Sequence, residues 1–249
     1  MGADKKAGRV PLSVPFLQAQ EIQDPLLVDS AWLEVGHVDE FLQFLPAKTP
    51  RGWRVMVSDP LAALKLLQGA QADGRGNETH ITHGSSNPTI DWFLANSTTV
   101  NEECARRIQG AIDLLKRETG ITDDEIWGVP VLYKRDFEPR VRSNGDFQVI
   151  AAYPNAINGL VLTDSLYVAP KQWGPLDADG TDIMQHAVEM VYEKAGFDVD
   201  FVDDWGFHYI KGDIHCVANV FRELPTSIKQ SDPTAGEEKL CMDSTESVP

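Results

Sequence analysis

The stretch that decides the fold of this chain is residues 53–67, WRVMVSDPLAALKLL. Its first five residues alternate in character and predict a β-strand over residues 53–57. Asp59 can then cap a helix through its side chain, and Pro60 suits the first helical position because it lacks a backbone N–H. A strand that passes directly into an amphipathic helix is typical of α/β proteins. The helix is predicted to bury one stripe of leucines, namely Leu61, Leu64 and Leu67.

Strands and helices alternate along the rest of the chain, so the predicted fold class is α/β or α+β. Thr99 and Glu102 have capping-box spacing and predict a helix that ends at Gly120. A second helix is predicted over residues 181–195, and the polar residues 69–90 predict a long surface loop. The first of these helices is predicted to bury Val100, Cys104, Ile108, Ile112 and Leu115. Further strands are predicted over residues 129–133, 147–153, 160–163, 166–169, 199–202 and 214–221, with a hairpin across 160–169.

Three segments are predicted along the 249 residues. Residues 1–27 show little hydrophobic period and predict a poorly ordered leader. Residues 28–225 carry the strands and helices and predict one domain. Residues 226–249 lose the period and are rich in Ser, Thr, Pro, Glu and Lys, which predicts a disordered tail.

The charge of the chain restricts its partners. Lys and Arg number 22 and Asp and Glu number 38, so the formal net charge is −16. Negative charge repels the phosphates of nucleic acids and of anionic membranes, and it suits a cationic substrate. The three cysteines, Cys104, Cys216 and Cys241, are too few for a disulfide framework and favour a reducing compartment. With no secretory signal and no long apolar run, the sequence predicts a cytoplasmic protein without a membrane span.

Cys216 is the first candidate for chemistry. It stands in the run Gly212–Asn219, GDIHCVAN. A nucleophilic thiol needs a nearby cation or base that favours the thiolate. His215 is the neighbouring residue, but on the predicted strand it points to the opposite face, which makes it a poor base. The alternative is a buried cysteine that packs as a small hydrophobic residue.

His37 and Asp39 are the second candidate pair, in the run Val35–Glu40. Two residues apart in an extended segment, they lie on the same side and can act on one substrate. Half of a metal site and a plain surface loop are the alternatives. No second cluster of His, Cys or Asp stands at ligand spacing, so no metal ligand is assigned. His80 and His83 fall in the predicted loop and are expected to be solvated.

Four motifs of the chain resemble those of the peptidylarginine deiminases and occur in the same order. The run Val35–Phe41 resembles the histidine motif of that family, and Gly212–Cys216 with Ala218–Val220 resembles its cysteine motif. Between them, Tyr153–Leu162 and Pro170–Pro175 are similar to two further segments. The resemblance covers about residues 30–225.

The resemblance implies a fold and a reaction. The fold is the α/β-propeller of the guanidino-modifying (pentein) enzymes, in which ββαβ modules surround a pseudo-fivefold axis, and the chain matches roughly the last three of five modules. Cys216 then attacks the guanidinium carbon of a peptidyl arginine, and His37 protonates the departing ammonia. Water activated by His37 cleaves the thiouronium intermediate and leaves citrulline. Asp39 pairs with the guanidinium, whose planar fork matches a carboxylate, and Val35 lines the aliphatic stem of the substrate.

The chain also departs from the family pattern. A second guanidinium-binding aspartate, an arginine that grips the substrate backbone and the calcium-ligating carboxylates belong to segments upstream of the histidine motif and have no match here. Calcium dependence is therefore expected from the resemblance alone, with ligands upstream of this chain, and the chain by itself is expected to have low or no activity. Two alternatives stay open: a non-catalytic fragment or pseudoenzyme that binds basic partners, and a small-molecule guanidine deiminase of the same superfamily. Formation of a homodimer also stays open.

Overall fold

The computed structural model describes residues 1–22, 24–135 and 147–221. Contacts divide the chain into two units, Met1–Ala218 and Asn219–Pro249, and every helix and strand of the described residues belongs to the first unit. The predicted tail, residues 226–249, lies outside the described residues. Within the described residues, no helix is both long and apolar enough to cross a membrane.

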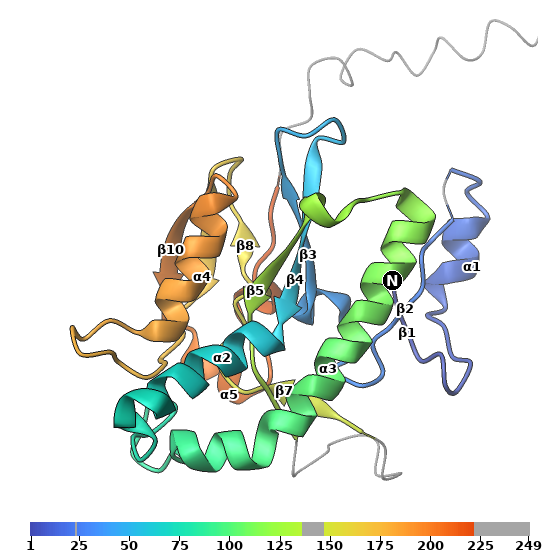
Figure 1. The fold of residues 1–249 in the computed structure, drawn as a ribbon. Coiled ribbons are helices and arrows are strands. Elements are labelled where there is room, and N and C mark those ends of the chain that lie inside the picture. The colour runs from blue at the N-terminus through green and yellow to red at the C-terminus, as the bar shows by residue number, and fades with distance from the viewer. Residues whose placement is uncertain (23, 136–146, 222–249) are drawn as a thin grey trace, which may run out of the picture. The chain divides into compact units, whose positions relative to one another are not determined.

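The first sheet consists of β3 (Leu42–Pro46), β4 (Trp53–Asp59) and β5 (Ile126–Pro130), in that order. Strands β3 and β4 pair antiparallel, whereas β4 and β5 pair parallel. A parallel pair needs a long crossover, which here contains α2 (Pro60–Ala70) and α3 (Ile90–Thr119). The two helices pack against each other, and α3, the long green helix of Figure 1, also contacts β4.

The second sheet repeats this order. Strands β8 (Leu160–Val161) and β9 (Leu166–Pro170) form the predicted hairpin. Helix α4 (Ile183–Lys194) then leads to β10 (Asp198–Val202), which pairs parallel with β9. Both sheets therefore follow the sequence hairpin, helix, parallel strand, and the prediction of a mixed α/β chain is confirmed.

Shorter elements complete the described chain. Strand β1 (Gly2–Ala3) pairs with β2 (Val28–Asp29), and β6 (Tyr133–Arg135) pairs with β7 (Val149–Ala151). The division of the chain after residue 27 stays a prediction, although β1 and β2 pair across it. The remaining elements are the α-helices α1 (Ser13–Gln18), α5 (Trp205–Tyr209) and α6 (Ile214–Val217), the 3-10 helices Val38–Glu40 and Asp123–Glu125, and the π-helix Gln71–Arg75.

The start of α2 confirms the expected cap. The Asp59 side chain accepts a hydrogen bond from the N–H of Ala62 at 2.9 Å, and Pro60 is the first helical residue. Leu64 and Leu67 are buried as predicted. Leu61 is 44% exposed, so the prediction that it belongs to the buried stripe was wrong. The buried face is centred between Leu64 and Leu67, and Leu61 lies about 90° away from that centre around the helix.

The start of α3 was also predicted wrongly. The helix begins at Ile90, where Thr89 caps it by accepting the N–H of Trp92 at 3.2 Å, and not near Thr99. Its end at Gly120, with a φ of 67°, agrees with the prediction. The predicted loop over residues 69–90 is therefore too long, because both of its ends are helical. Of the predicted stripe, Val100, Cys104, Ile108 and Leu115 are buried and Ile112 is partly buried.

An aromatic group in the core supports the segment that carries His37. The rings of Trp32 and Phe41 lie 5.4 Å apart, and those of Trp32 and Tyr133 lie 5.5 Å apart. All three side chains are at most 1% exposed. The hydroxyl of Tyr133 lies within hydrogen-bonding distance of the Glu40 carbonyl oxygen, at 3.1 Å, and of Ser58 Oγ, at 2.9 Å. The backbone at Glu40 is thereby tied to the core.

Candidate active site

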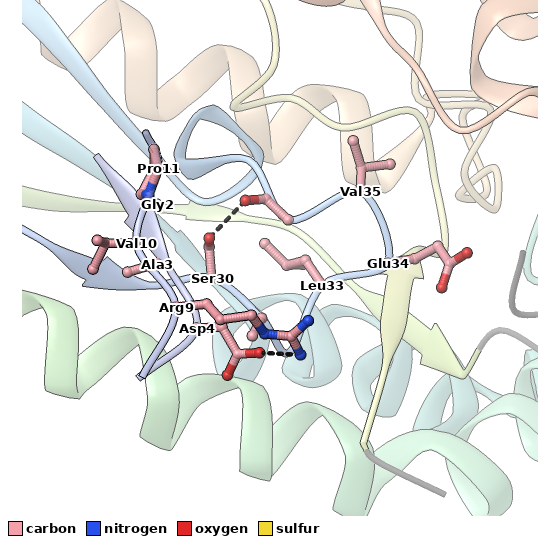
Figure 2. A pocket seen from close by; sticks show the side chains of 12 residues that line it. Gly2, Ala3, Asp4, Arg9, Val10, Pro11, Ser30, Leu33, Glu34 and Val35 are labelled. Carbon is pink, nitrogen blue, oxygen red and sulfur yellow. Dashed lines mark hydrogen bonds and ion pairs between the residues drawn. The ribbon is translucent and has the colours of Figure 1, made fainter. Parts of the chain in front are cut away.

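A tight turn carries Val35 and His37. Gly36 has a φ of +83°, which a residue with a side chain adopts only with strain, and its carbonyl oxygen accepts the Ser30 hydroxyl at 2.6 Å. Figure 2 shows this hydrogen bond at the edge of a hollow of about 250 Å³, which residues of the N-terminal segment also line. Val35 is 38% exposed and borders both this hollow and a second cavity at Cys216.

The residues after this turn coil into the 3-10 helix Val38–Glu40. The expectation that His37 and Asp39 lie on one side of an extended segment was therefore wrong. The N–H of His37 donates to Glu40 Oε1 at 2.7 Å, which closes the turn. The carbonyl oxygen of Glu40 accepts the side-chain amide of Asn155 at 2.8 Å.

Cys216 lies on the short helix α6, so the predicted strand over residues 214–221 was wrong. Among the described residues, no strand pairs with this segment. Its backbone bonds elsewhere: the N–H of His215 donates to the Asn158 carbonyl at 3.0 Å, and the N–H of Cys216 donates to the Asp213 carbonyl at 3.1 Å.

His215 contacts Asp39 because the segment is helical. Its Nδ1 lies 2.7 Å from Asp39 Oδ2, and the side chains are 50% and 32% exposed. The expectation that a strand turns His215 away from the site was wrong. His215 therefore shares the site with Asp39.

Asn158 connects Asp39 to Cys216. Its Nδ2 donates to Asp39 Oδ2 at 3.0 Å, and its Oδ1 accepts the Cys216 thiol at 3.2 Å. The residue is only 1% exposed. Two of the predicted site residues, far apart in sequence, are thus joined by one side-chain amide.

His37 and Val35 lie at the edge of this arrangement. Val35 lines the cavity at Cys216 together with Asn158. The His37 side chain is exposed, and within the part of the chain that the structure describes no hydrogen bond or ion pair joins it to Asp39 or Cys216. The structure therefore brings Cys216, Asp39 and Val35 together, and places His37 at the start of the helix that carries Asp39.

Carboxylates surround the Cys216 thiol. Glu40 and Asp213 line its cavity, which at about 20 Å³ has room for about one water molecule. Burial raises the pKa of Cys216, and the charges of Asp39, Asp213 and Glu40 raise it further. The resting cysteine is therefore a protonated thiol in a negative field, which favours the approach of a cation.

Two buried acids, Asp213 and Asp204, extend the acidic group at the cavity. Asp213 is 6% exposed, and its Oδ1 lies 3.2 Å from His208 Nδ1. Burial and the neighbouring charge of Asp213 raise the pKa of Asp204 to about 7. Neither carboxylate oxygen of Asp204 has a hydrogen-bond partner among the described residues. Asp204 and Asp213 therefore hold their protons more tightly than solvated aspartates do, and Asp213 lines the cavity at Cys216.

A metal does not fit the described residues. Among them, no group of three or more His, Cys, Asp or Glu side chains is arranged to hold a metal ion. The calcium that the resemblance implies is consequently given no ligand and no step of the reaction in this chain.

The two loop histidines are structural. His80 is 3% exposed, and its Nδ1 lies 3.1 Å from the Tyr153 hydroxyl, so the expectation of a solvated side chain was wrong. Burial, followed by the charge of Lys134, lowers the pKa of His80 to about 3. The ring of His83 stacks on Trp205 with centroids 4.1 Å apart. The His80 ring packs on Phe93 of α3, with centroids 4.5 Å apart, whereas the His83 ring packs on the two tryptophans Trp173 and Trp205.

Four residues of the site carry no role in the sequence-based prediction, namely Glu40, Asn158, Asp213 and His215. Each of them stands inside one of the motifs that carry the family resemblance. That position is the only signal in the sequence. Their roles depend on contacts between the motifs, which a single sequence does not show.

The fold and the site define a mixed α/β protein with a thiol beside a hydrogen-bonded carboxylate, in a negative field. The family model "Protein-arginine deiminase (PAD)" matches residues 3–227. The chain belongs to the protein-arginine deiminase family, which confirms the resemblance.

Relatives in the family agree with this assignment. The chain is 35% identical over 215 residues to protein-arginine deiminase type-4 of Mus musculus, a match that covers 84% of this chain and 31% of the relative. It is 35% identical over 221 residues to protein-arginine deiminase type-4 of Homo sapiens, covering 86% of this chain and 31% of the relative. It is 32% identical over 216 residues to protein-arginine deiminase type-1 of Homo sapiens, covering 84% and 30%. The chain thus spans about a third of the length of these relatives.

Glu40 makes the stability of the fold depend on pH. Burial, followed by the charges of Asp39 and Asp213, raises the pKa of Glu40 from 4.5 to about 7, although the N–H of His37 opposes the shift. Between these values the folded state holds the proton and the unfolded state has released it, so stability is full below about pH 4.5 and falls as the pH rises to about 7. The loss amounts to about 3 kcal/mol at most.

We expect Glu40→Gln, which keeps an oxygen for the N–H of His37, to flatten this dependence. Urea unfolding at about pH 5 and about pH 8 measures it, because the free energy of unfolding of the variant should fall less between the two values. Glu102→Gln, on the exposed face of α3, is the matched control and should follow the wild type. Parallel curves for wild type and Glu40→Gln would contradict the assignment of the buried proton to Glu40.

Proposed function

We propose that this chain carries the cysteine and histidine motifs of a protein-arginine deiminase site, which hydrolyses peptidyl-arginine to peptidyl-citrulline and ammonia. One observation carries the proposal: a single buried amide, that of Asn158, contacts both the Asp39 carboxylate and the Cys216 thiol. A guanidinium group is a cation with a carbon at its centre, and it needs these two partners side by side. The match of the family model over residues 3–227 supports the same reaction.

The proposed reaction begins with binding. The substrate guanidinium displaces His215 and pairs with Asp39, and Val35 lies beside its aliphatic stem. Among the described residues, none donates a hydrogen bond to Asp39 Oδ1, so this oxygen is available for the cation. Pairing holds the guanidinium carbon near the sulfur and brings a positive charge to the thiol, which favours the thiolate.

The proposed chemistry passes through a covalent intermediate on Cys216. Cys216 releases its proton to water, and Sγ forms a bond to the guanidinium carbon. One carbon–nitrogen bond breaks, and the departing nitrogen leaves as ammonia with a proton from His37. His37 then removes a proton from a water molecule, whose oxygen adds to the same carbon of the thiouronium intermediate. The carbon–sulfur bond breaks, the thiolate returns, and citrulline is left.

The partial propeller is also a proposal. It is supported by the topology that the two sheets share, since β3–β5 and β8–β10 each follow the order hairpin, helix, parallel strand. Such a repeat is what ββαβ modules around a common axis would produce. Dependence on calcium, formation of a homodimer and a cytoplasmic location stay predictions.

Slow turnover is expected from the geometry. The cavity has room for about one water molecule, Asp39 is engaged by His215, and the pKa of Cys216 is raised. The test is citrulline release from N-benzoyl-arginine amide at high protein concentration over hours, with calcium and with a chelator, beside free arginine and agmatine.

We expect more product from the acylated amide than from free arginine or agmatine. Product mainly from the small molecules would favour the small-molecule deiminase. A folded sample that yields no product from any of the three would contradict a deiminase activity of this chain.

A second candidate is binding of a basic partner without turnover. The ion pair between His215 and Asp39, the acids lining the cavity and the net charge of −16 favour it. Binding of an arginine-rich peptide to Cys216→Ala, measured by calorimetry at low and high salt, tests it. Salt-sensitive binding would support this candidate, and no binding at low salt would exclude it.

A further inference from the structure

The orientation of the Asn158 amide follows from its two neighbours. A carboxylate only accepts hydrogen bonds, so the NH2 group of Asn158 must face Asp39, 3.0 Å away. The carbonyl oxygen of the amide therefore faces Cys216 and accepts both its thiol, at 3.2 Å, and its N–H, at 3.4 Å. A flipped amide would set two acceptors against each other at Asp39, so only one orientation satisfies the site.

The backbone of Asn158 is held as firmly as its side chain. Its N–H donates to the Asn155 carbonyl at 2.9 Å, and its carbonyl accepts the N–H of His215 at 3.0 Å. The next residue, Gly159, donates its N–H to the Tyr167 hydroxyl at 2.9 Å. A Cβ at Gly159 would overlap this hydroxyl, so the chain passes here without room to shift. Asn158 thus has a fixed place between strand β9 and the Cys216 helix.

We propose that Asn158 is a positioning residue, whose amide sets the distance between the Asp39 carboxylate and the Cys216 thiol so that one planar cation reaches both. The inference rests on the proposed function, because it deepens the account of the same site. Asn158 does not itself contact the reacting carbon in this account. It acts through Asp39, which it keeps turned toward the sulfur.

The test compares two reagents that alkylate Cys216 and differ in charge. Chloroacetamidine is a planar cation that can pair with Asp39, and chloroacetamide is its neutral counterpart. Alkylation is followed by mass spectrometry of the tryptic peptide of residues 212–222, which holds Cys216 and is distinct from the peptide that holds Cys104. The measured quantity is the alkylation rate with chloroacetamidine divided by the rate with chloroacetamide. This ratio is divided by the same ratio for a small free thiol, and the result is called the cation preference.

We expect the wild-type chain to show a cation preference of about tenfold or more, since a hydrogen bond to a charged group changes an equilibrium by about that factor. Asn158→Ala should lose about tenfold of this preference, while the rate with chloroacetamide changes much less. Asn158→Leu fills a similar volume without hydrogen bonds and should lose as much of the cation preference. It shows whether the effect of Asn158→Ala comes from the cavity that the smaller side chain leaves. In an Asp39→Asn background, Asn158→Ala should lower the preference no further, because Asn158 acts through Asp39.

Asn101→Ala is the matched control. Asn101 is also fully buried, and its side chain bonds only backbone groups of Ser97 and Tyr133, among the described residues. This variant should be less stable but keep the cation preference, so lost stability alone does not reproduce the effect.

Each outcome decides the inference. A wild-type preference that persists in both Asn158 variants overturns it and leaves the proposed function standing. A wild-type chain without a preference also overturns it, because Asp39 and Cys216 then do not share a cation. A preference that disappears with Asn158, in a chain that releases no citrulline, supports the inference while the proposed function fails.

Discussion

Cys216→Ala is expected to abolish citrulline release from N-benzoyl-arginine amide, by about a thousandfold or more relative to the wild type. The proposed reaction passes through a bond between Sγ and the guanidinium carbon, and alanine offers no atom for it. Binding of the substrate depends on Asp39 and should survive the substitution. The measurement is product formed under single-turnover conditions, with the chain in excess over substrate.

Cys104→Ala is the matched control for Cys216→Ala. Cys104 lies on α3, is 0% exposed, and burial raises the pKa of its thiol far above the usual range. This variant should lose some stability, because a small cavity replaces the sulfur, but it should keep its citrulline release. Equal product from wild type and Cys216→Ala would contradict the role of Cys216 as nucleophile.

Asp39→Asn is expected to move two measurements in opposite directions. Loss of the carboxylate removes the charged partner of the guanidinium, and kcat/KM for the amide substrate should fall by about 10- to 100-fold. The same change removes a negative charge that raises the pKa of Cys216. The neutral reagent chloroacetamide should therefore alkylate Cys216 faster in the variant than in the wild type at about pH 7.

The opposite signs separate a loss of charge from general damage. A misfolded variant would not change the two rates in opposite directions. Loss of the carboxylate slows turnover of the cationic substrate and speeds alkylation of Cys216 by the neutral reagent. Asp113→Asn, on the exposed side of α3, should leave both rates unchanged. If Asp39→Asn kept its full kcat/KM, another carboxylate of the cavity, Glu40 or Asp213, would have to bind the guanidinium.

Local patterns in the sequence were enough to predict much of the fold. The cap at Asp59, the end of α3 at Gly120 and the hairpin of β8 and β9 depend on residues only a few positions apart, and the structure confirms all three. The motifs at both ends of the chain also predicted the family, which the comparisons confirm. The sequence pattern failed where an element is very short. Helix α6 has only four residues, too few to distinguish a helical period from the alternation of a strand.

The site itself depends on contacts that no local pattern contains. Asn158 and His215 lie 119 and 176 residues after Asp39 in the sequence. One carboxylate oxygen of Asp39 nevertheless accepts hydrogen bonds from both side chains. By itself, therefore, the sequence determined the class of fold, the family and the nucleophile candidate. Only the tertiary structure decided what surrounds the thiol, because hydrogen bonds and buried charge depend on which segments meet in space, and not on their order along the chain.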